Sequence, residues 1–243
     1  MRLYTFSKRC AKEIVRDPVN LCFGLGFPVV LLLLLSAMQS NIPVDLFRID
    51  SLAPGIAVFG LSFMTLFSAT LIAKDRESSF LTRLYTTPLK AREFILGYML
   101  PIIPLSLGQS AVCYLVALPL GLTPSVNILA AILGILPISA LYVSLGLLVG
   151  SLVGVKAVGG ICGGLFTNLS AWLSGVWFDI TLIGGAFEGV ARALPFIHAV
   201  EMERALISGD FRGALPHFAI VLAYSCVTSV LAVAAFLRQM KKQ

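Results

Sequence analysis

Apolar residues follow one another in long stretches over most of the chain, and polar residues are concentrated in short segments between those stretches. A helix needs about 20 apolar residues to cross the hydrocarbon core of a bilayer. The pattern therefore predicts an all-α integral membrane protein with six transmembrane helices. We expect these helices at residues 19–38, 52–73, 94–120, 127–154, 157–178 and 214–237.

The composition supports the membrane assignment. Hydrophobic residues make up 58% of the 243 residues and charged residues only 12%, and the mean hydropathy is +0.95. Soluble domains carry roughly a quarter charged residues, so a soluble protein is excluded. The formal net charge of +6 would suggest nucleic acid as a partner in a soluble protein. Here the basic residues flank apolar spans, and we expect no nucleic-acid partner and contact with membrane lipid instead.

The distribution of basic residues predicts the orientation. Under the six-span topology, fourteen of the 18 Lys and Arg residues fall on one side of the membrane and four on the other. Cytoplasmic loops hold the excess of Lys and Arg, so both termini are expected in the cytoplasm. This describes a multi-pass protein of a bacterial or archaeal plasma membrane. No small-residue cleavage site follows the first apolar run, so we expect that span to be retained and not removed as a signal.

We interpret residues 1–243 as one transmembrane domain. Three polar segments of this domain have residue patterns that predict further helices. Residues 1–18 predict an amphipathic helix along the inner membrane surface. Its apolar face holds Leu3, Phe6, Cys10 and Ile14, and its basic face holds Lys8, Lys12 and Arg16.

The second segment, residues 74–93, predicts a cytoplasmic loop that contains a short helix ended by Pro88. Its apolar stripe consists of Phe80, Leu81, Leu84 and Tyr85. The third segment, residues 179–213, is too long for a bare connection. Glycine and proline divide it into two short external helices, 187–194 and 198–207.

Several kinds of chemistry have no residues to support them. The chain contains no phosphate-binding loop of the form G-x-x-x-x-G-K-[ST], so it is not expected to hydrolyse ATP or to act as an enzyme. The predicted spans contain no Asp, Glu, Lys or Arg, which counts against ion-driven transport. The cysteines lack metal-ligand spacing and are expected to be small buried hydrophobic residues. They are Cys10, Cys22, Cys113, Cys162 and Cys226.

An intramembrane hydrolase is the other enzymatic alternative. Ser174 lacks the glycine expected two residues before a rhomboid-like nucleophile. We interpret His198 and His217 as interfacial polar groups and not as bases or zinc ligands. Glu201 and Arg204 have the i,i+3 spacing of a helical ion pair.

Small and polar residues recur inside the spans. Glycines at four-residue spacing allow helix backbones to approach closely, either within the chain or in a dimer. These are Gly146, Gly150, Gly154, Gly160 and Gly164. A second set of residues either lines a path for an amphipathic substrate or forms interhelical hydrogen bonds. This set consists of Ser62, Thr65, Thr167, Asn168 and Ser174.

The order of these features resembles the permease subunit of type-2 ABC exporters, especially the small daunorubicin-resistance and nodulation-type permeases. The similarity covers nearly the whole chain. It includes Pro54-Gly55, Phe59-Gly60, Lys74-Asp-Arg-Glu-Ser-Ser, Arg83-Leu84, Thr87-Pro88-Leu89, Glu93-Phe94 and Gly97.

The resemblance implies a function and partners. Two soluble ATPase subunits would hold ATP and Mg, and this chain itself would bind no cofactor. A second permease copy or a sister permease would complete the substrate path, and the external helices would close its outer gate. The loop after the second span would form a coupling helix in a groove of the ATPase. The matching residues are Asp75, Arg76, Glu77, Phe80, Leu81, Leu84, Tyr85 and Pro88.

One position departs from that family's pattern, because Ser78 and Ser79 stand where relatives commonly have a glycine after the acidic pair. The expected function is export of an amphipathic drug, antibiotic or lipid-like substrate. A passive channel or ion-coupled carrier and an intramembrane hydrolase are the two alternatives.

Overall fold

The computed structural model describes residues 2–43, 45–78 and 91–240, and every regular element in these ranges is a helix. The first half contains α1 (Arg2–Val15), α2 (Pro18–Leu21), the π-helix η1 (Cys22–Gly26), α3 (Phe27–Gln39), α4 (Ile49–Glu77) and α6 (Ala91–Ala117). The second half contains α7 (Asn127–Leu152), α8 (Val155–Val158), the π-helix η2 (Gly159–Phe166), α9 (Thr167–Leu173), the 3-10 helix η3 (Ile180–Leu182), α10 (Gly185–Ala193), α11 (Pro195–Ser208) and α12 (Phe211–Met240).

Five helical stretches in the described ranges are long and apolar enough to cross a membrane. They coincide with five of the six predicted spans, which supports the prediction of a multi-pass, all-α membrane protein. The stretches are Cys22–Gln39, Ile49–Glu77, Glu93–Ala117, Asn127–Leu152 and Phe211–Gln239.

The predicted span 157–178 is not one regular helix. Instead α8, η2 and α9 follow one another over residues 155–173, and the central π-helix has the sequence GGICGGLF. Glycine destabilises a helix interior by about 1 kcal/mol relative to alanine, and π-helical turns occur in short pieces. The helix ends before Gly175, whose φ of +70° suits glycine. The count of six regular spans is therefore not confirmed.

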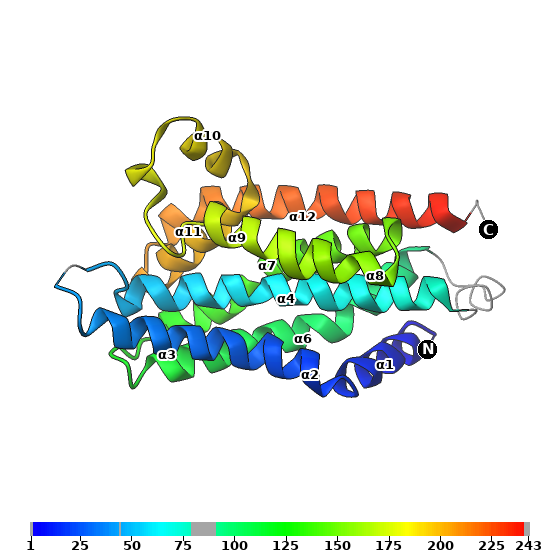
Figure 1. Ribbon diagram of the computed structural model, residues 1–243, viewed down its shortest axis with the longest axis horizontal. Coiled ribbons are helices and arrows are strands. Elements are labelled where there is room, and N and C mark those ends of the chain that lie inside the picture. Colours follow the sequence, from blue (N-terminus) through cyan, green and yellow to red (C-terminus); the bar gives the residue numbers. More distant parts are fainter. Residues whose placement is uncertain (1, 44, 79–90, 241–243) are drawn as a thin grey trace.

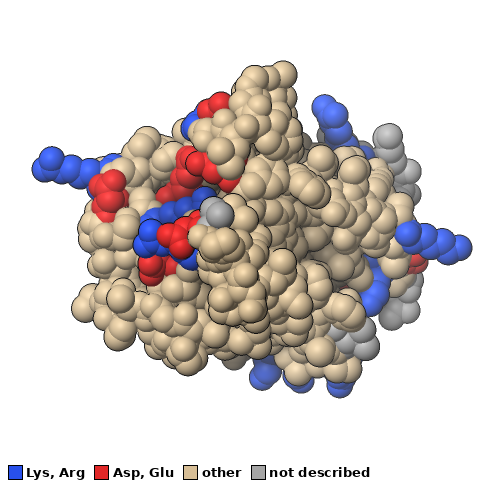
Figure 2. All heavy atoms as spheres, turned by 60° about the vertical axis from the view of Figure 1, so that its left-hand side comes forward, with Lys and Arg blue, Asp and Glu red and all other residues tan. Residues whose placement is uncertain are grey.

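The helices form a bundle with two different ends (Figure 1). At one end lie α1, the end of α4 and the last turns of α12, and at the other lie α10, α11 and the connection from α3 to α4. The run of α8, η2 and α9 carries the chain between these ends. On the face shown in Figure 2, a broad surface without charged side chains separates two charged zones. This distribution is typical of a membrane protein, whose charged groups avoid the hydrocarbon core.

The centre of the bundle is α4, which contacts α3, α6, α7 and α11. It approaches α7 closely, because a Cβ at Gly146 would collide with Ser68 Oγ and a Cβ at Gly150 would collide with the Ala69 carbonyl oxygen. The hydroxyl of Thr65 donates to the Tyr142 carbonyl oxygen at 2.9 Å across this contact. Two of the predicted packing glycines therefore act between helices of the same chain.

The other predicted glycines have different surroundings. A Cβ at Gly154 would lie 2.8 Å from Glu77 Oε1, so this glycine belongs to a contact between the ends of α4 and α7. Gly160 and Gly164 would meet no atom within 4 Å. They pack against nothing in the described part of the chain.

The amphipathic helix predicted for residues 1–18 is present as α1. Phe6, Cys10 and Ile14 are buried on one face, and Lys8 and Lys12 are exposed on the other. The Phe6 ring stacks on Phe94 at a centroid distance of 5.2 Å and meets the edge of Tyr98 at 5.0 Å. The apolar face of α1 therefore packs on α6.

The two short helices predicted within 179–213 are also present, as α10 and α11. Most of α11 is buried against α4, α7 and α12. Arg204 does not form the predicted ion pair with Glu201. It donates to the carbonyl oxygens of Ser51 at 3.2 Å and Gly175 at 2.9 Å. The Ser51 carbonyl lies in the first turn of α4 and the Gly175 carbonyl follows the end of α9, so the half-buried guanidinium of Arg204 links α11 to both helices.

A buried carboxyl group also holds α11 against α6. The Glu203 side chain is fully buried, and its Oε2 accepts a hydrogen bond from the Tyr114 hydroxyl of α6 at 2.7 Å. Burial raises the pKa of Glu203 to about 8, although the Tyr114 bond opposes this shift. The protonated carboxyl group is thereby favoured at neutral pH, and it is compatible with the apolar surroundings of α11.

The close contact of α4 with α7 generates the first testable prediction. Substituting Gly146→Ala should destabilise the protein by about 1–3 kcal/mol, because the added methyl group overpacks a helix contact that includes backbone. The matched control is Gly164→Ala, where the methyl group meets open space and alanine favours the helix. Thermal unfolding in detergent compares the two variants. Equal midpoints would contradict the close α4–α7 contact.

Candidate coupling site and groove

A buried carboxylate at the end of α4 joins three helices. Asp75 is 2% exposed, and its carboxylate accepts hydrogen bonds from both terminal nitrogens of Arg9, which lies on α1. The distance from Arg9 Nη2 to Asp75 Oδ1 is 2.6 Å. The hydroxyl of Tyr98 on α6 donates to Asp75 Oδ2 at 2.6 Å. Arg9 also pairs with Glu13 one turn further along α1, at 2.8 Å. A buried carboxylate requires such charged and hydrogen-bonding partners, so α1 and α6 are held in place by Asp75.

The next two residues hold two other helices. Arg76 donates from Nη1 to the carbonyl oxygens of Gly150 at 2.8 Å and Val153 at 3.1 Å, at the end of α7. Glu77 Oε1 accepts from the backbone N–H of Val155 at 2.8 Å, at the start of α8. Cations are favourable at helix C-termini and anions at helix N-termini. Both side chains therefore have the charge that suits the helix end they contact.

Three consecutive residues thus connect α4 to α1, α6, α7 and α8 immediately before segment 79–90. Of the residues predicted to contact the ATPase, Asp75, Arg76 and Glu77 are described. The others, Phe80, Leu81, Leu84, Tyr85 and Pro88, lie outside the described residues. These three described residues of the predicted coupling segment therefore connect helices of this chain to one another.

The second candidate site is a groove of about 460 Å³ between η1, α3, α4 and the η2–α9 run. Its rings come from Phe23, Phe27, Phe59, Phe63, Trp172 and Trp177, and its polar groups from Thr167 and Asn168. Both polar side chains also bond to backbone carbonyls one turn earlier, at 2.9 Å each. The groove combines a large aromatic surface with a few hydrogen-bonding groups, which is typical of sites for partly apolar ligands.

The remaining residues of the predicted substrate path lie elsewhere. Ser62 and Thr65 are fully buried and donate to the carbonyl oxygens of Phe59 at 2.8 Å and Tyr142 at 2.9 Å. Ser174 is buried and donates to Ala171 at 3.3 Å. No histidine contacts Ser174 in the described ranges, so no nucleophile and base pair is formed there. The structure places only Thr167 and Asn168 at the groove.

Sequence reasoning missed the aromatic lining of the groove and the partners of Asp75. The phenylalanines at 23, 27, 59 and 63 recur at four-residue spacing within two spans, and this spacing could have indicated one shared aromatic face. The pairing of Arg9 with Asp75 bridges 66 positions in the chain. No local pattern indicates such a contact.

Comparison with known proteins identifies similar sequences. The family model described as ABC-2 type transporter matches residues 1–207. The chain is 35% identical over 94 residues to "Putative transport permease ycf38" of Porphyra purpurea, covering 37% of this chain and 32% of that protein. The protein of the same name from Cyanophora paradoxa is 34% identical over 102 residues, covering 39% of this chain and 34% of that protein. The matched region therefore spans about a third of the length of these relatives.

The junction at Asp75 generates a prediction that uses Cys10, a fully buried residue beside Arg9. Burial raises the pKa of the Cys10 thiol to about 12, which suppresses its reactive thiolate. Asp75→Asn should cost about 2–4 kcal/mol, because it leaves Arg9 without its buried partner. It should also detach α1 and accelerate maleimide labelling of Cys10, measured in a background that lacks the exposed Cys22 and Cys226.

The matched control for Asp75→Asn is Glu13→Gln. It removes the other carboxylate that contacts Arg9, and the Glu13 side chain is 32% exposed. Exposed pairs contribute at most about 1 kcal/mol, so labelling should stay slow in this variant. Slow labelling of Cys10 in both variants would show that Asp75 does not hold α1.

Proposed function

Because the chain belongs to the ABC-2 type transporter family, we propose that it is the membrane-spanning permease subunit of an ATP-driven exporter in the cytoplasmic membrane. The match over residues 1–207 carries the proposal, since that range includes both the coupling site and the groove. In the proposed complex, two copies of a soluble ATPase subunit hold ATP and Mg. A second permease copy or a sister permease completes the membrane part.

The proposed topology has six crossings with both termini in the cytoplasm. The run of α8, η2 and α9 serves as the fifth crossing, because it connects the two ends of the bundle between α7 and α12 (Figure 1). In this topology α10 and α11 lie on the outer side. The excess of Lys and Arg near α1, the end of α4 and the end of α12 supports this orientation.

The proposed coupling element is segment 74–93, with Phe80, Leu81, Leu84, Tyr85 and Pro88 seated on the ATPase. Movement of that segment would act first on Asp75, Arg76 and Glu77. These residues contact four helices, so a displacement at this point would be passed to most of the bundle. Packed interfaces convert small shifts into rearrangements of whole helices.

The proposed substrate is amphipathic, such as a drug, an antibiotic or a lipid-like molecule. The aromatic rings of the groove would contact its apolar body, and Thr167 and Asn168 would offer hydrogen bonds to a polar group. On the η2–α9 run Gly163 lines the groove, and a Cβ at Gly160 or Gly164 would meet no atom within 4 Å. This is the face on which we place the second permease.

The coupling proposal predicts that Leu84→Asp releases the ATPase. A carboxylate in an apolar interface remains without a partner and should weaken binding by about 2–4 kcal/mol, or roughly 30- to 1,000-fold. Co-purification with the ATPase and stimulation of its ATP hydrolysis measure the effect. The control is Leu84→Met, which keeps an apolar side chain of similar volume. Full binding by the Leu84→Asp variant would contradict the assignment of this segment.

The groove proposal predicts that Thr167→Trp strongly reduces transport while it leaves the ATPase bound, because the indole fills the space between the aromatic rings. The control is Leu165→Trp, since Leu165 is 60% exposed on the same run and does not line the groove. Efflux of an amphipathic fluorescent dye from cells that express the permease and the ATPase measures transport. Equal efflux by both variants would show that the substrate does not pass through this groove.

A further inference from the structure

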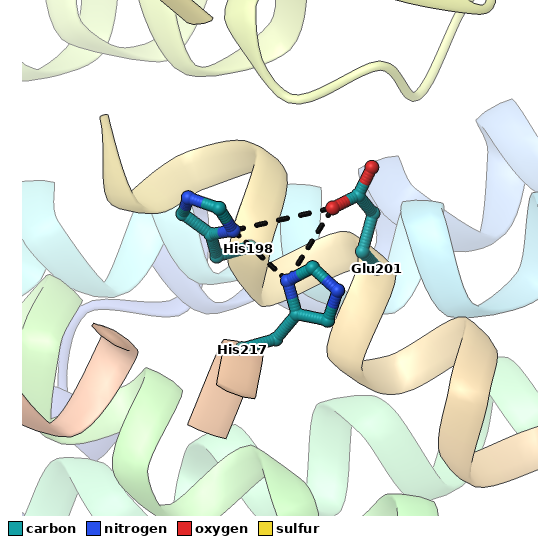
Figure 3. Close-up of side chains that lie close together, drawn as sticks. All are labelled: His198, Glu201 and His217. Carbon is teal, nitrogen blue, oxygen red and sulfur yellow. Dashed lines mark hydrogen bonds and ion pairs between the residues drawn. The ribbon is translucent and has the colours of Figure 1, made fainter. Parts of the chain in front are cut away.

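Three side chains capable of binding a metal converge at the outer end of the bundle (Figure 3). His198 and Glu201 lie one turn apart on α11, and His217 lies in the second turn of α12. Nδ1 of His198 lies 2.9 Å from Nδ1 of His217. Oε2 of Glu201 lies 3.4 Å from His217 Nδ1 and 4.0 Å from His198 Nδ1.

The hydrogen bonding of His198 determines which of its nitrogens is available. Nε2 lies 2.9 Å from the carbonyl oxygen of Arg192, and a carbonyl can only accept, so Nε2 carries the proton. In the neutral ring the lone pair of Nδ1 then points into the cluster. Metal-binding histidines typically donate their second N–H to a carbonyl or carboxylate in this way.

The carboxylate also has a free ligand atom. Glu201 Oε2 is buried and accepts no hydrogen bond in the described ranges. A buried carboxylate oxygen that accepts no hydrogen bond is unfavourable, and a bound cation would satisfy it. The side chains of the cluster are between 11% and 29% exposed, so an ion could enter and keep one open position.

The separations fit a small transition-metal ion. A point equidistant from three atoms that are 2.9, 3.4 and 4.0 Å apart lies about 2.0 Å from each, and Zn²⁺ binds imidazole nitrogen and carboxylate oxygen at about 2.0–2.2 Å. Two imidazoles and one carboxylate are ligands suited to Zn²⁺ and related divalent ions, and less so to Mg²⁺ or Ca²⁺.

We propose that His198, Glu201 and His217 bind a divalent transition-metal ion such as Zn²⁺, with a fourth position open to solvent. The chain has two histidines in all, and both belong to this cluster. The ion would join α11 to α12 and, through the carbonyl of Arg192, to the end of α10. It would therefore stabilise the outer helices against the last span.

This proposal revises the interpretation of the two histidines as separate interfacial groups. The i,i+3 spacing of His198 and Glu201 does place both on one helix face, and this was a usable signal. The third ligand comes from another helix, so the spacing of residues along the chain did not indicate a complete site. The proposal is independent of the partner ATPase and of the transported substrate.

The test uses the full-length protein in detergent, purified through a tag without histidine and treated with a chelator. Zn²⁺ is titrated against a competing chromogenic chelator, and Co²⁺ serves as a spectroscopic probe of coordination. We expect wild-type protein to bind one Zn²⁺, to unfold at a higher temperature when Zn²⁺ is bound and to give the intense visible bands of four-coordinate Co²⁺. His217→Asn and Glu201→Gln should each weaken binding more than about 10-fold, since each removes a ligand.

The matched control is Glu188→Gln, which removes a carboxylate that pairs with Arg192 outside the cluster and should leave Zn²⁺ affinity unchanged. A second measurement needs only the wild-type protein, so it applies even if a variant fails to fold.

In this measurement, bound Zn²⁺ should protect both histidines from modification by diethyl pyrocarbonate. Unprotected histidines, or wild-type affinity no tighter than that of His217→Asn, would overturn the proposal and assign the cluster to a proton shared between the histidines.

Discussion

A single buried carboxylate, Asp75, determines how one end of this bundle is assembled. An ionised carboxyl group that is removed from water needs a positive charge and hydrogen-bond donors. Here Arg9 of α1 and Tyr98 of α6 supply them. The neighbours Arg76 and Glu77 contact the end of α7 and the start of α8. The position of α1 on the bundle surface, and the connection of four helices to the end of α4, follow from this set of polar contacts.

The two ends of the bundle are stabilised in different ways. At the end that carries α1, charged side chains form ion pairs and contact helix termini. At the opposite end, α11 is inserted among the spans and held by Arg204 and Glu203. Between them, α4 and α7 pack through glycines and hydroxyl groups, and the aromatic groove lies beside the η2–α9 run.

Much of the fold could be predicted from the sequence because bilayer thickness sets the length of an apolar helix. Five spans were found in this way, whereas α1 was found from the helical spacing of its apolar residues and the pair α10 and α11 from the glycine and proline that divide segment 179–213. The π-helix at 159–166 was not, because apolar run length does not distinguish a regular helix from a glycine-rich one with a different hydrogen-bond pattern. Family resemblance singled out residues 75–77, but it did not indicate the side chains and backbone groups that these residues contact. Contacts such as that of Arg9 with Asp75 depend on how the helices pack, and the spacing of residues along the chain does not indicate that packing.

We propose above that this chain is a permease driven by a separate ATPase. The most direct measurement is purification of the tagged wild-type protein from its native membranes in mild detergent, followed by mass spectrometry and an ATP hydrolysis assay. We expect a soluble protein with a phosphate-binding loop, present in a fixed ratio to the permease, and ATP hydrolysis in the purified complex. A pure permease without such a partner, which still moves solute across liposome membranes in the absence of ATP, would contradict it.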